Sequence, residues 1–243
     1  MSHSTVVEIG PGKGAITGIL AERAQRLIAI ELDRELAPQL RERFRDRSSV
    51  SILEDDVLQV NFEELCMSDE KLVIVGNLPY YITSDILLHL FEHQASIARA
   101  VIMIQREVAD RVAAAPGTRD YGLLSATAKL YARVEKLMTL PPRAFSPQPE
   151  VHSTVLRLTM ASRFNELQVT PEGFIPFLKA CFAQKRKTLG NNLRAAGWKN
   201  EAILAAFEAC EIPSPARAEE LELEVSACLF RTLTAQNRQQ DHP

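Results

Sequence analysis

The sequence predicts an α/β fold with a mostly parallel, doubly wound sheet, followed by a smaller domain made only of helices. Two observations support the sheet. Short apolar, β-branched runs alternate with helical patterns through residue 160, and a glycine-rich turn follows the first of these runs. A third observation supports the helical domain, because residues 171–235 are rich in Ala, Leu and Glu and contain no further β-rich run.

The expected strands are short apolar runs, and each expected helix presents one apolar face. The strands of the seven-stranded sheet are Val6–Ile9, Leu27–Glu31, Val50–Leu53, Leu72–Val75, Ala100–Ile104, a run over 130–137, and Thr154–Leu158. The helices between them are Gly14–Ala24, Arg34–Phe44, Ser84–His93 and Arg106–Ala115. Thr83 directly precedes one of these helices, and we expect its hydroxyl to act as the N-cap.

The boundary between the two domains is expected near residue 160. Residues 161–170 read as a linker, and Thr170 with Pro171 begins a helix that has proline at its first position. The prediction is therefore a sheet domain at 1–160, which would bind the cofactor, and a helical domain at 161–243, which would dock RNA.

Composition indicates an ordinary globular chain. The apolar fraction is 46% and the charged fraction 24%, both typical of such proteins. No apolar stretch approaches the ~20 residues of a membrane-spanning helix, and the chain enters a strand without a secretory leader. The cysteines show no Cys-x-x-Cys pairing and are expected to be reduced: Cys66, Cys181, Cys210 and Cys228. We expect a cytoplasmic monomer with no membrane partner.

The net charge of −3 conceals a basic segment. Residues 173–199 contain no Asp or Glu, and their cations are Lys179, Lys185, Arg186, Lys187, Arg194 and Lys199. A local basic patch can bind phosphates even when the whole protein is slightly acidic. We expect Lys185, Arg186 and Lys187 to contact nucleic acid, and the alternative is a merely solvated helix face.

The segment from Glu8 to Gly14 follows the first strand and has the composition of a nucleotide-binding turn. Gly10 and Gly12 let the backbone approach a ligand closely. Glu31 ends the second strand, where a carboxylate can accept both hydroxyls of a ribose. The spacing from Gly10 to Ala15 also fits a dinucleotide fingerprint, so it does not exclude NAD, and a glycine turn that serves only packing is a further alternative.

Three acids, Glu54, Asp55 and Asp56, follow the third strand, and only one of them need contact a ligand. A carboxylate at this place suits the amino group of an adenine, and we favour Asp56 over Asp55; the alternative is a solvated acidic turn. Acidic residues also suit a cofactor whose reactive end is a cationic sulfonium and which has no phosphate to repel. They therefore favour S-adenosylmethionine over NAD.

The loop Asn77-Leu78-Pro79-Tyr80 follows the apolar run Leu72–Val75. Ligands of open α/β sheets bind beyond the carboxyl ends of the strands. The Asn77 side-chain oxygen and the Leu78 carbonyl, held before Pro79, would accept the two N–H bonds of an adenine amine and direct its lone pair at a methyl group. Tyr80 would stack on the base. The alternative is a strand-terminal turn closed by a core tyrosine.

His89 and His93 lie in a His-x-x-Glu-His pattern that resembles a zinc site. The pattern falls late in an amphipathic helix, and no matching ligands occur elsewhere in the sequence. We expect no metal, and surface histidines at these positions.

Taken together, these motifs resemble the ribosomal RNA adenine dimethyltransferase family, in particular its bacterial A-type enzymes that act on the small ribosomal subunit. The resemblance covers residues 6–235 and rests on segments 7–12, 29–33, 76–80, 105–111, 121–125 and 141–151, together with Asp56. It implies a Rossmann-like class I methyltransferase fold that uses S-adenosylmethionine. The implied reaction is dimethylation of N6 on two adjacent adenosines near the 3′ end of small-subunit 16S rRNA, during ribosome biogenesis.

The resemblance also implies roles for particular residues. Gly10, Glu31, Asp56 and Asn77 would contact the cofactor, and Asn77, Leu78, Pro79 and Tyr80 would hold the adenine. Glu8 and Gly12 of the glycine turn and Asp55 are further candidates for cofactor binding. Phe145, in the proline-rich loop 141–150, would be a second stacking residue, with a hydrophobic plug over the sheet as the alternative. Family members carry an N-terminal segment that closes over the cofactor; this sequence starts after it, and we expect weakened cofactor binding.

Three other functions remain open on the sequence. A macrolide-resistance adenine methyltransferase acting on large-subunit rRNA would have Ile in place of Leu78 and lacks the Phe145 loop in this form. A ribosome assembly factor could keep the fold without catalysis. An NAD-dependent oxidoreductase would leave the segment Asn77–Tyr80 without a role.

Overall fold

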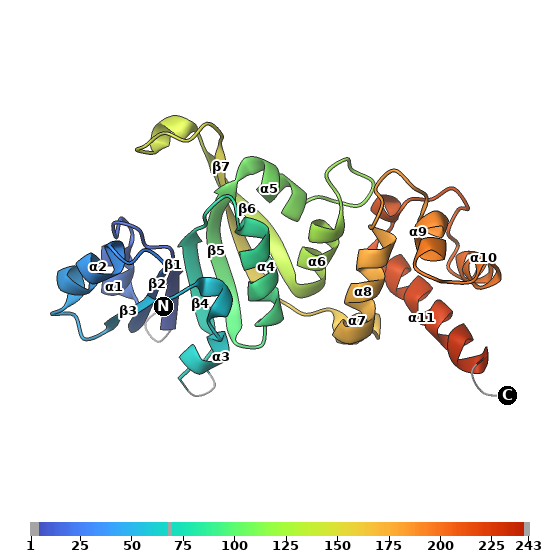
Figure 1. The fold of residues 1–243 in the computed structure, drawn as a ribbon, viewed down its shortest axis with the longest axis horizontal. Coiled ribbons are helices and arrows are strands. Elements are labelled where there is room, and N and C mark those ends of the chain that lie inside the picture. The colour runs from blue at the N-terminus through green and yellow to red at the C-terminus, as the bar shows by residue number, and fades with distance from the viewer. Residues whose placement is uncertain (1–4, 68–69, 241–243) are drawn as a thin grey trace. The chain divides into compact units, whose positions relative to one another are not determined.

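The computed structural model describes residues 5–67 and 70–240. A seven-stranded sheet has the order β3-β2-β1-β4-β5-β7-β6 (Figure 1), and β7 runs antiparallel to both of its neighbours while the others pair in parallel. The strands are β1 (Thr5–Ile9), β2 (Arg26–Glu31), β3 (Val50–Glu54), β4 (Leu72–Asn77), β5 (Ile97–Gln105), β6 (Ala132–Leu140) and β7 (Ser153–Met160). The predicted α/β class with a mostly parallel seven-stranded sheet is confirmed.

The strand directions decide which residues meet at one edge of the sheet. The parallel strands β1 to β5 end together at the carboxyl edge, where Ile9 pairs with Ile30 and Gly76, and Asn77 pairs with Met103. Since β7 runs the other way, it is the first residue of β7, Ser153, that reaches this edge. Ser153 pairs there with Gln105 of β5.

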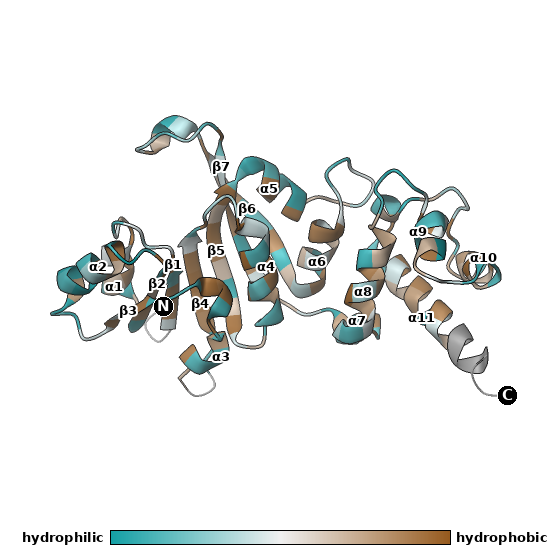
Figure 2. Ribbon diagram, in the orientation of Figure 1, coloured by the Kyte–Doolittle hydropathy of each residue, from teal (hydrophilic) through white to brown (hydrophobic). Residues whose placement is uncertain are grey.

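Apolar runs form the centre of the sheet, and Figure 2 shows β4 and β5 mostly in hydrophobic colours. All of β1 is buried, because its two faces are both covered as expected for a parallel strand. On one face, α1 (Thr17–Arg23) places Ala21 against Val6 and Leu27. The other helices of this part are α2 (Leu36–Phe44), α3 (Phe62–Leu65), α4 (Thr83–Glu92) and α5 (Arg106–Val112).

Two local predictions were wrong. The run 130–137 does not begin as a strand, because α6 (Leu123–Tyr131), a helix that the sequence does not predict, occupies its first residues. Ala126, Ala128 and Leu130 of α6 are buried, and a short helix buried on several sides has no clear helical periodicity in sequence. Thr83 is not an N-cap: Ile82 holds that position, and the Thr83 hydroxyl donates to the Pro79 carbonyl at 2.9 Å.

The chain divides into two compact units, which we call the sheet unit (Met1–Ala109 and Tyr131–Ala161) and the helical unit (Asp110–Leu130 and Ser162–Pro243). The sheet unit ends for the last time at Ala161, and the helical unit resumes at Ser162. The expected boundary after residue 160 lies one residue before this point. Residues 110–130 are predicted to belong to the first domain, yet they group with the helical unit. Two hydrogen bonds hold this segment there: Gly117 N–H to the Glu219 carbonyl, and Lys185 Nζ to the Arg119 carbonyl.

The helical unit packs around aromatic side chains. Its helices besides α6 are α7 (Phe164–Leu167), α8 (Pro171–Cys181), α9 (Leu189–Ala195), α10 (Asn200–Ala209) and α11 (Leu223–Gln240). Phe177 contacts the rings of Phe174, Phe230 and Trp198. The segment 161–170 is not a bare linker, since α7 buries Phe164 within it. None of the described helices is both long and apolar enough to cross a membrane.

Candidate functional site

The glycine turn after β1 lies at the carboxyl edge of the sheet. Gly10 and Gly12 have φ of +66° and +56°, a region that glycine adopts without strain. The Gly10 N–H donates to the Ile30 carbonyl at 3.0 Å, which holds the turn against β2. The helix that follows begins at Thr17 rather than at the predicted Gly14, so the turn is longer and offers more backbone to a ligand.

Glu31 is the best-held carboxylate of the site. It ends β2, is only 7% exposed, and accepts two backbone hydrogen bonds, from Gly12 N–H at 2.9 Å and from Asp33 N–H at 3.0 Å. Each of these bonds goes to a different carboxylate oxygen. Because an ionised carboxylate has about four acceptor positions, each oxygen keeps capacity for one more donor. The geometry suits a pair of ribose hydroxyls.

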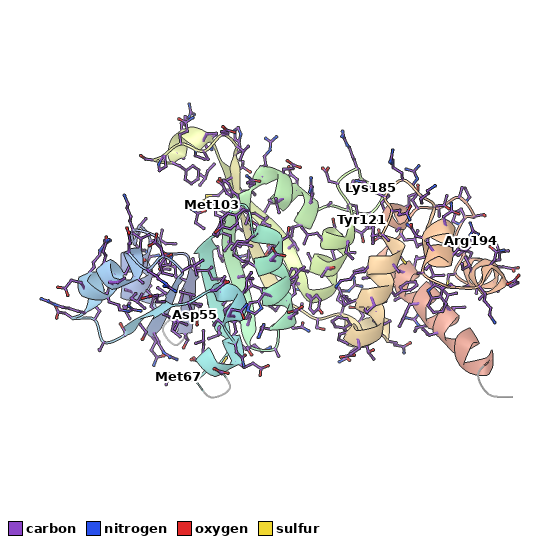
Figure 3. The ribbon with its side chains drawn as sticks, in the orientation of Figure 1. Asp55, Met67, Met103, Tyr121, Lys185 and Arg194 are labelled. Carbon is purple, nitrogen blue, oxygen red and sulfur yellow. The ribbon has the colours of Figure 1, made fainter. Side chains whose placement is uncertain are left out.

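Asp55 and Asp56 follow β3, and both are fixed by local hydrogen bonds. The Asp55 side chain accepts from Asp56 N–H at 2.8 Å. The Asp56 side chain accepts from Leu58 N–H at 3.0 Å and so caps the short 3-10 helix Val57–Gln59. These bonds hold each carboxylate in one orientation. The Asp55 side chain is labelled in Figure 3.

A cavity of about 380 Å³ collects most of these groups. It is lined by Ile9, Gly10, Ile30, Glu31, Leu32, Asp33, Asp55, Asp56, Val57, Pro79, Tyr81, Ile82 and Ile86. The sequence therefore predicts three of the four acids in this lining, Glu31, Asp55 and Asp56, and it predicts neither Asp33 nor the apolar walls, chiefly Leu32, Val57 and Tyr81. Leu32 has a usable signal in the sequence, since it directly follows the acid at a strand end. In the structure this apolar side chain is 58% exposed.

The charge of this lining selects among ligands. Among the residues that line the cavity there are four acids and no Lys or Arg. Such a wall repels the pyrophosphate of a dinucleotide and attracts a ligand that carries positive charge. The residues present fit a nucleoside whose other end is cationic.

Glu8, in the middle of the site's first strand, adds an unusual buried carboxyl. It is 1% exposed, and among the described residues its Oε2 atom has no hydrogen-bond partner of good geometry. Burial raises the pKa of the Glu8 carboxyl above its ordinary value, the neighbouring Thr17 hydroxyl interacts with the carboxyl and offsets part of this rise, and the negative charge of Glu31 raises the pKa further. A buried carboxyl with an unsatisfied oxygen, two residues before the glycine turn, would be stabilised in its ionised form by positive charge nearby.

The raised pKa of Glu8 predicts a pH dependence of stability. Between the ordinary value of 4.5 and the higher folded value, the unfolded chain has lost the Glu8 proton while the folded chain keeps it. This contribution to the free energy of unfolding is therefore complete below pH 4.5 and is lost as pH rises through the folded pKa. Urea denaturation between pH 4 and pH 8 is expected to show this decline in the wild type and a flatter profile in Glu8→Gln. Equal slopes for the two proteins would contradict it.

The loop after β4 is positioned by close packing of two strands. A side chain at Gly76 would come within 2.9 Å of the Ile9 carbonyl oxygen, so only glycine lets β4 lie this close to β1. Asn77 ends β4 and is exposed. Leu78 is buried, and its N–H donates to the Met103 carbonyl at 3.0 Å. The backbone on both sides of the Asn77 side chain is thus held in place.

The rest of the loop bends back toward β7. Pro79 lines the cavity, and its carbonyl accepts from the Thr83 hydroxyl, which fixes the turn into α4. Tyr80 is half-buried, and its hydroxyl lies 2.8 Å from the Ser153 hydroxyl. Asn77 and Tyr80 therefore flank the cavity-lining Pro79 without belonging to the lining themselves.

Several predicted site residues do not line this cavity: Glu8, Gly12 and Leu78 of the sheet's carboxyl edge, Phe145, and the basic run Lys185, Arg186 and Lys187. Phe145 is half-buried at the end of the short helix Pro142–Ala144, in a loop that Figure 1 shows projecting from β6 and β7, and it does not line the cavity. Lys185, Arg186 and Lys187 are exposed and belong to the helical unit. Figure 3 labels Lys185, whose Nζ donates to the Arg119 carbonyl at 2.9 Å.

His89 and His93 make hydrogen bonds to backbone carbonyls and pack against an aromatic ring. The His89 ring donates to the Val60 carbonyl at 2.9 Å, and the His93 ring to the His89 carbonyl at 3.0 Å. Both rings contact Phe62. Over the described part of the chain, no cluster of three or more His, Cys, Asp or Glu side chains could hold a metal ion.

Comparison with protein families gives one match that spans nearly the whole chain. Residues 2–234 match the family model described as ribosomal RNA adenine dimethylase. A protein of Acidobacterium capsulatum named ribosomal RNA small subunit methyltransferase A is 67% identical over 94% of this chain and 81% of its own. A protein of the same name from Koribacter versatilis is 55% identical over 96% of this chain and 86% of its own.

Solved structures agree with the fold. A dimethyladenosine transferase from Plasmodium falciparum superposes with a TM-score of 0.78 at 22% identity, covering 98% of this chain and 90% of its own. The 23S rRNA methyltransferase ErmE superposes with a TM-score of 0.70 at 25% identity, covering 96% and 91%. Both likenesses extend over nearly the full length of the chain, so they concern the fold of both units.

Proposed function

Because the chain belongs to the ribosomal RNA adenine dimethylase family, we propose that it transfers methyl groups from S-adenosylmethionine to the N6 atoms of two adjacent adenosines near the 3′ end of 16S rRNA. The observation that carries this proposal is the acidic, phosphate-repelling cavity at the carboxyl edge of the sheet, whose lining includes Pro79, two residues after Asn77 at the end of β4. The names of the relatives at 67% and 55% identity support small-subunit rRNA as the substrate.

The cavity residues would divide the cofactor between them. Glu31 would accept the ribose hydroxyls on the oxygen positions that Gly12 and Asp33 leave, Asp56 would accept from the adenine amine, and Asp55 would add negative charge to that wall. Leu32 and Val57 would flank the adenine ring. Glu8 does not line the cavity, but it lies two residues before Gly10, and a cationic group bound nearby would favour the ionised form of its buried carboxyl. When bound, S-adenosylmethionine supplies a methyl group that its sulfonium centre makes electrophilic.

The chain's own contribution to the reaction is orientation of the target amine. The lone pair of an adenine amine is delocalised into the ring and is a poor nucleophile. With both N–H bonds donated to the Asn77 side-chain oxygen and the Leu78 carbonyl, the nitrogen would become tetrahedral and its lone pair available. Tyr80 would hold the base by stacking after it leaves its own stack. No strong base is needed, since the methylated cationic amine loses its proton readily.

The helical unit would dock the RNA backbone. Lys185, Arg186 and Lys187 are exposed on one loop, and the hydrogen bond from Lys185 to the Arg119 carbonyl sets the segment 115–120 beside that loop. Arg119 is itself exposed. Phosphate contacts of this kind position a protein on RNA without reading its sequence.

Replacing Lys185, Arg186 and Lys187 by alanine is expected to weaken rRNA binding and reduce its salt dependence. Loss of three phosphate contacts should lower the slope of log affinity against log salt by about two. Filter binding from low to moderate salt measures that slope. The control is Arg45→Ala with Arg47→Ala, at the opposite edge of the sheet from the cavity, where both cations pair with surface acids. An unchanged slope in the triple variant would contradict the docking role.

The reaction is tested by incubating the protein with labelled S-adenosylmethionine in two parallel reactions, one with small subunits that lack these methyl groups and one with unmethylated 23S rRNA. Mass spectrometry of the digested rRNA is expected to find N6,N6-dimethyladenosine in 16S rRNA. Transfer to 23S rRNA instead would support the macrolide-resistance type, and tight subunit binding without transfer would support an assembly factor.

A further inference from the structure

Ser153, the first residue of β7, makes a hydrogen bond to Tyr80, the residue proposed to stack on the target base. Its hydroxyl lies 2.8 Å from the Tyr80 hydroxyl, across 73 positions of the chain. Ser153 is fully buried, whereas Tyr80 is half-buried. The phenol oxygen of Tyr80 is thus tied to an immobile point while the ring remains partly accessible.

The fold explains why Ser153 alone of β7 can make this contact. β7 is antiparallel to β5, so its first residue lies at the edge where β4 and β5 end. Two pairings fix that residue: Ser153 with Gln105 on one side and with Leu140 on the other. The preceding His152 carbonyl accepts from Arg106 N–H at 2.9 Å, which anchors the start of the strand.

We propose that Ser153 is a positioning residue for adenine methylation, which holds the Tyr80 ring in the orientation that stacks on the target base. This inference rests on the proposed function and adds a residue to it. The role is indirect, because a side chain buried behind the tyrosine acts through the tyrosine alone.

The physical effect is restriction of one side-chain torsion. Without the hydrogen bond, the Tyr80 ring can rotate about χ1. Binding of the base then costs the conformational entropy of the ring in addition to that of the base. A hydrogen bond at the far end of the ring removes that freedom before the base arrives. Preorganisation of this kind raises the rate of transfer without adding a contact to the RNA.

A purely structural role makes a different prediction. If the bond only satisfied a buried hydroxyl, its removal would lower thermal stability and leave catalysis by the folded enzyme unchanged. The neighbouring Thr154 offers a matched control, since it is also buried on β7 and its hydroxyl lies 3.0 Å from that of Thr139, away from Tyr80.

The test is a double-mutant cycle on the full chain with small subunits as substrate. Ser153→Ala and Tyr80→Phe are each expected to lower kcat about three- to tenfold, the value of one hydrogen bond. The double variant should be no slower than either single variant, because both changes remove the same bond. Affinity for S-adenosylmethionine should stay at the wild-type value in all of them. Thr154→Val should lose stability and keep the wild-type kcat.

A second readout does not depend on transfer. With ring-labelled tyrosine, the Tyr80 NMR signals should be sharp in the wild type and averaged or shifted in Ser153→Ala. The inference is overturned if the double variant loses kcat by the product of the two single losses. It is also overturned if Ser153→Ala has the wild-type kcat, or if its Tyr80 signals are unchanged. If the wild type itself transfers no methyl groups, the proposed function fails, and the NMR comparison still decides whether Ser153 holds the ring.

Discussion

Replacing Asn77 by alanine is expected to slow methyl transfer by about 10²–10³-fold, the usual cost of losing one preorganised polar group at a reacting centre. The Asn77 side-chain oxygen is the acceptor proposed for one N–H bond of the target amine. Without it the amine keeps its flat geometry and its delocalised lone pair. The fold should be unaffected, because Asn77 is exposed at the end of β4 and β4 is held by its neighbours.

The measurement is single-turnover transfer to small subunits, with thermal unfolding recorded for each protein. Asn165→Ala is the matched control, since Asn165 is also exposed but lies on α7 in the helical unit. Its rate should equal that of the wild type. A rate for Asn77→Ala within a few fold of the wild type would remove Asn77 from the reaction.

Replacing Glu31 by alanine is expected to weaken S-adenosylmethionine binding by about 100-fold or more, because hydrogen bonds to a charged group contribute about 1.5–3 kcal/mol each. Two such bonds to the ribose would be lost. The change also leaves the N–H groups of Gly12 and Asp33 without their acceptor, so the glycine turn loses one of its two ties to β2 and keeps the bond from Gly10 N–H to the Ile30 carbonyl.

Isothermal titration calorimetry with S-adenosylmethionine measures this loss. Glu42→Ala serves as the control, since Glu42 is an exposed acid of α2 whose ion pair with Arg45 contributes little. Its affinity should match that of the wild type. If Glu31→Ala bound the cofactor with wild-type affinity, the ribose would have to lie elsewhere.

Much of the site could be predicted because parallel strands end at a common edge. Glu31, Asp55 and Asn77 are far apart in sequence, yet each directly follows or ends an apolar run, and that single rule places them together. The glycine turn was recognisable for the same reason. The fold class followed from the alternation of the same runs with helices.

The remainder depends on contacts that periodicity does not encode. Ser153 was missed because it begins an antiparallel strand, so its place at the carboxyl edge follows only from the strand order. The segment 110–130 was assigned to the wrong unit because hydrogen bonds such as that of Gly117 to Glu219 decide its packing. Phe145 was expected to stack on the target base, and its position outside the cavity lining leaves that role a proposal.

The most direct test of the account is a crystal structure of the chain with S-adenosylhomocysteine, the demethylated product of the proposed cofactor. We expect its ribose hydroxyls within hydrogen-bond distance of Glu31, and its adenine between Leu32 and Val57 with the amine toward Asp56. The vacant side of the sulfur should face the Asn77 side chain. A nucleoside bound at another place on the sheet unit, with Glu31 still bonded only to Gly12 and Asp33, would contradict the account.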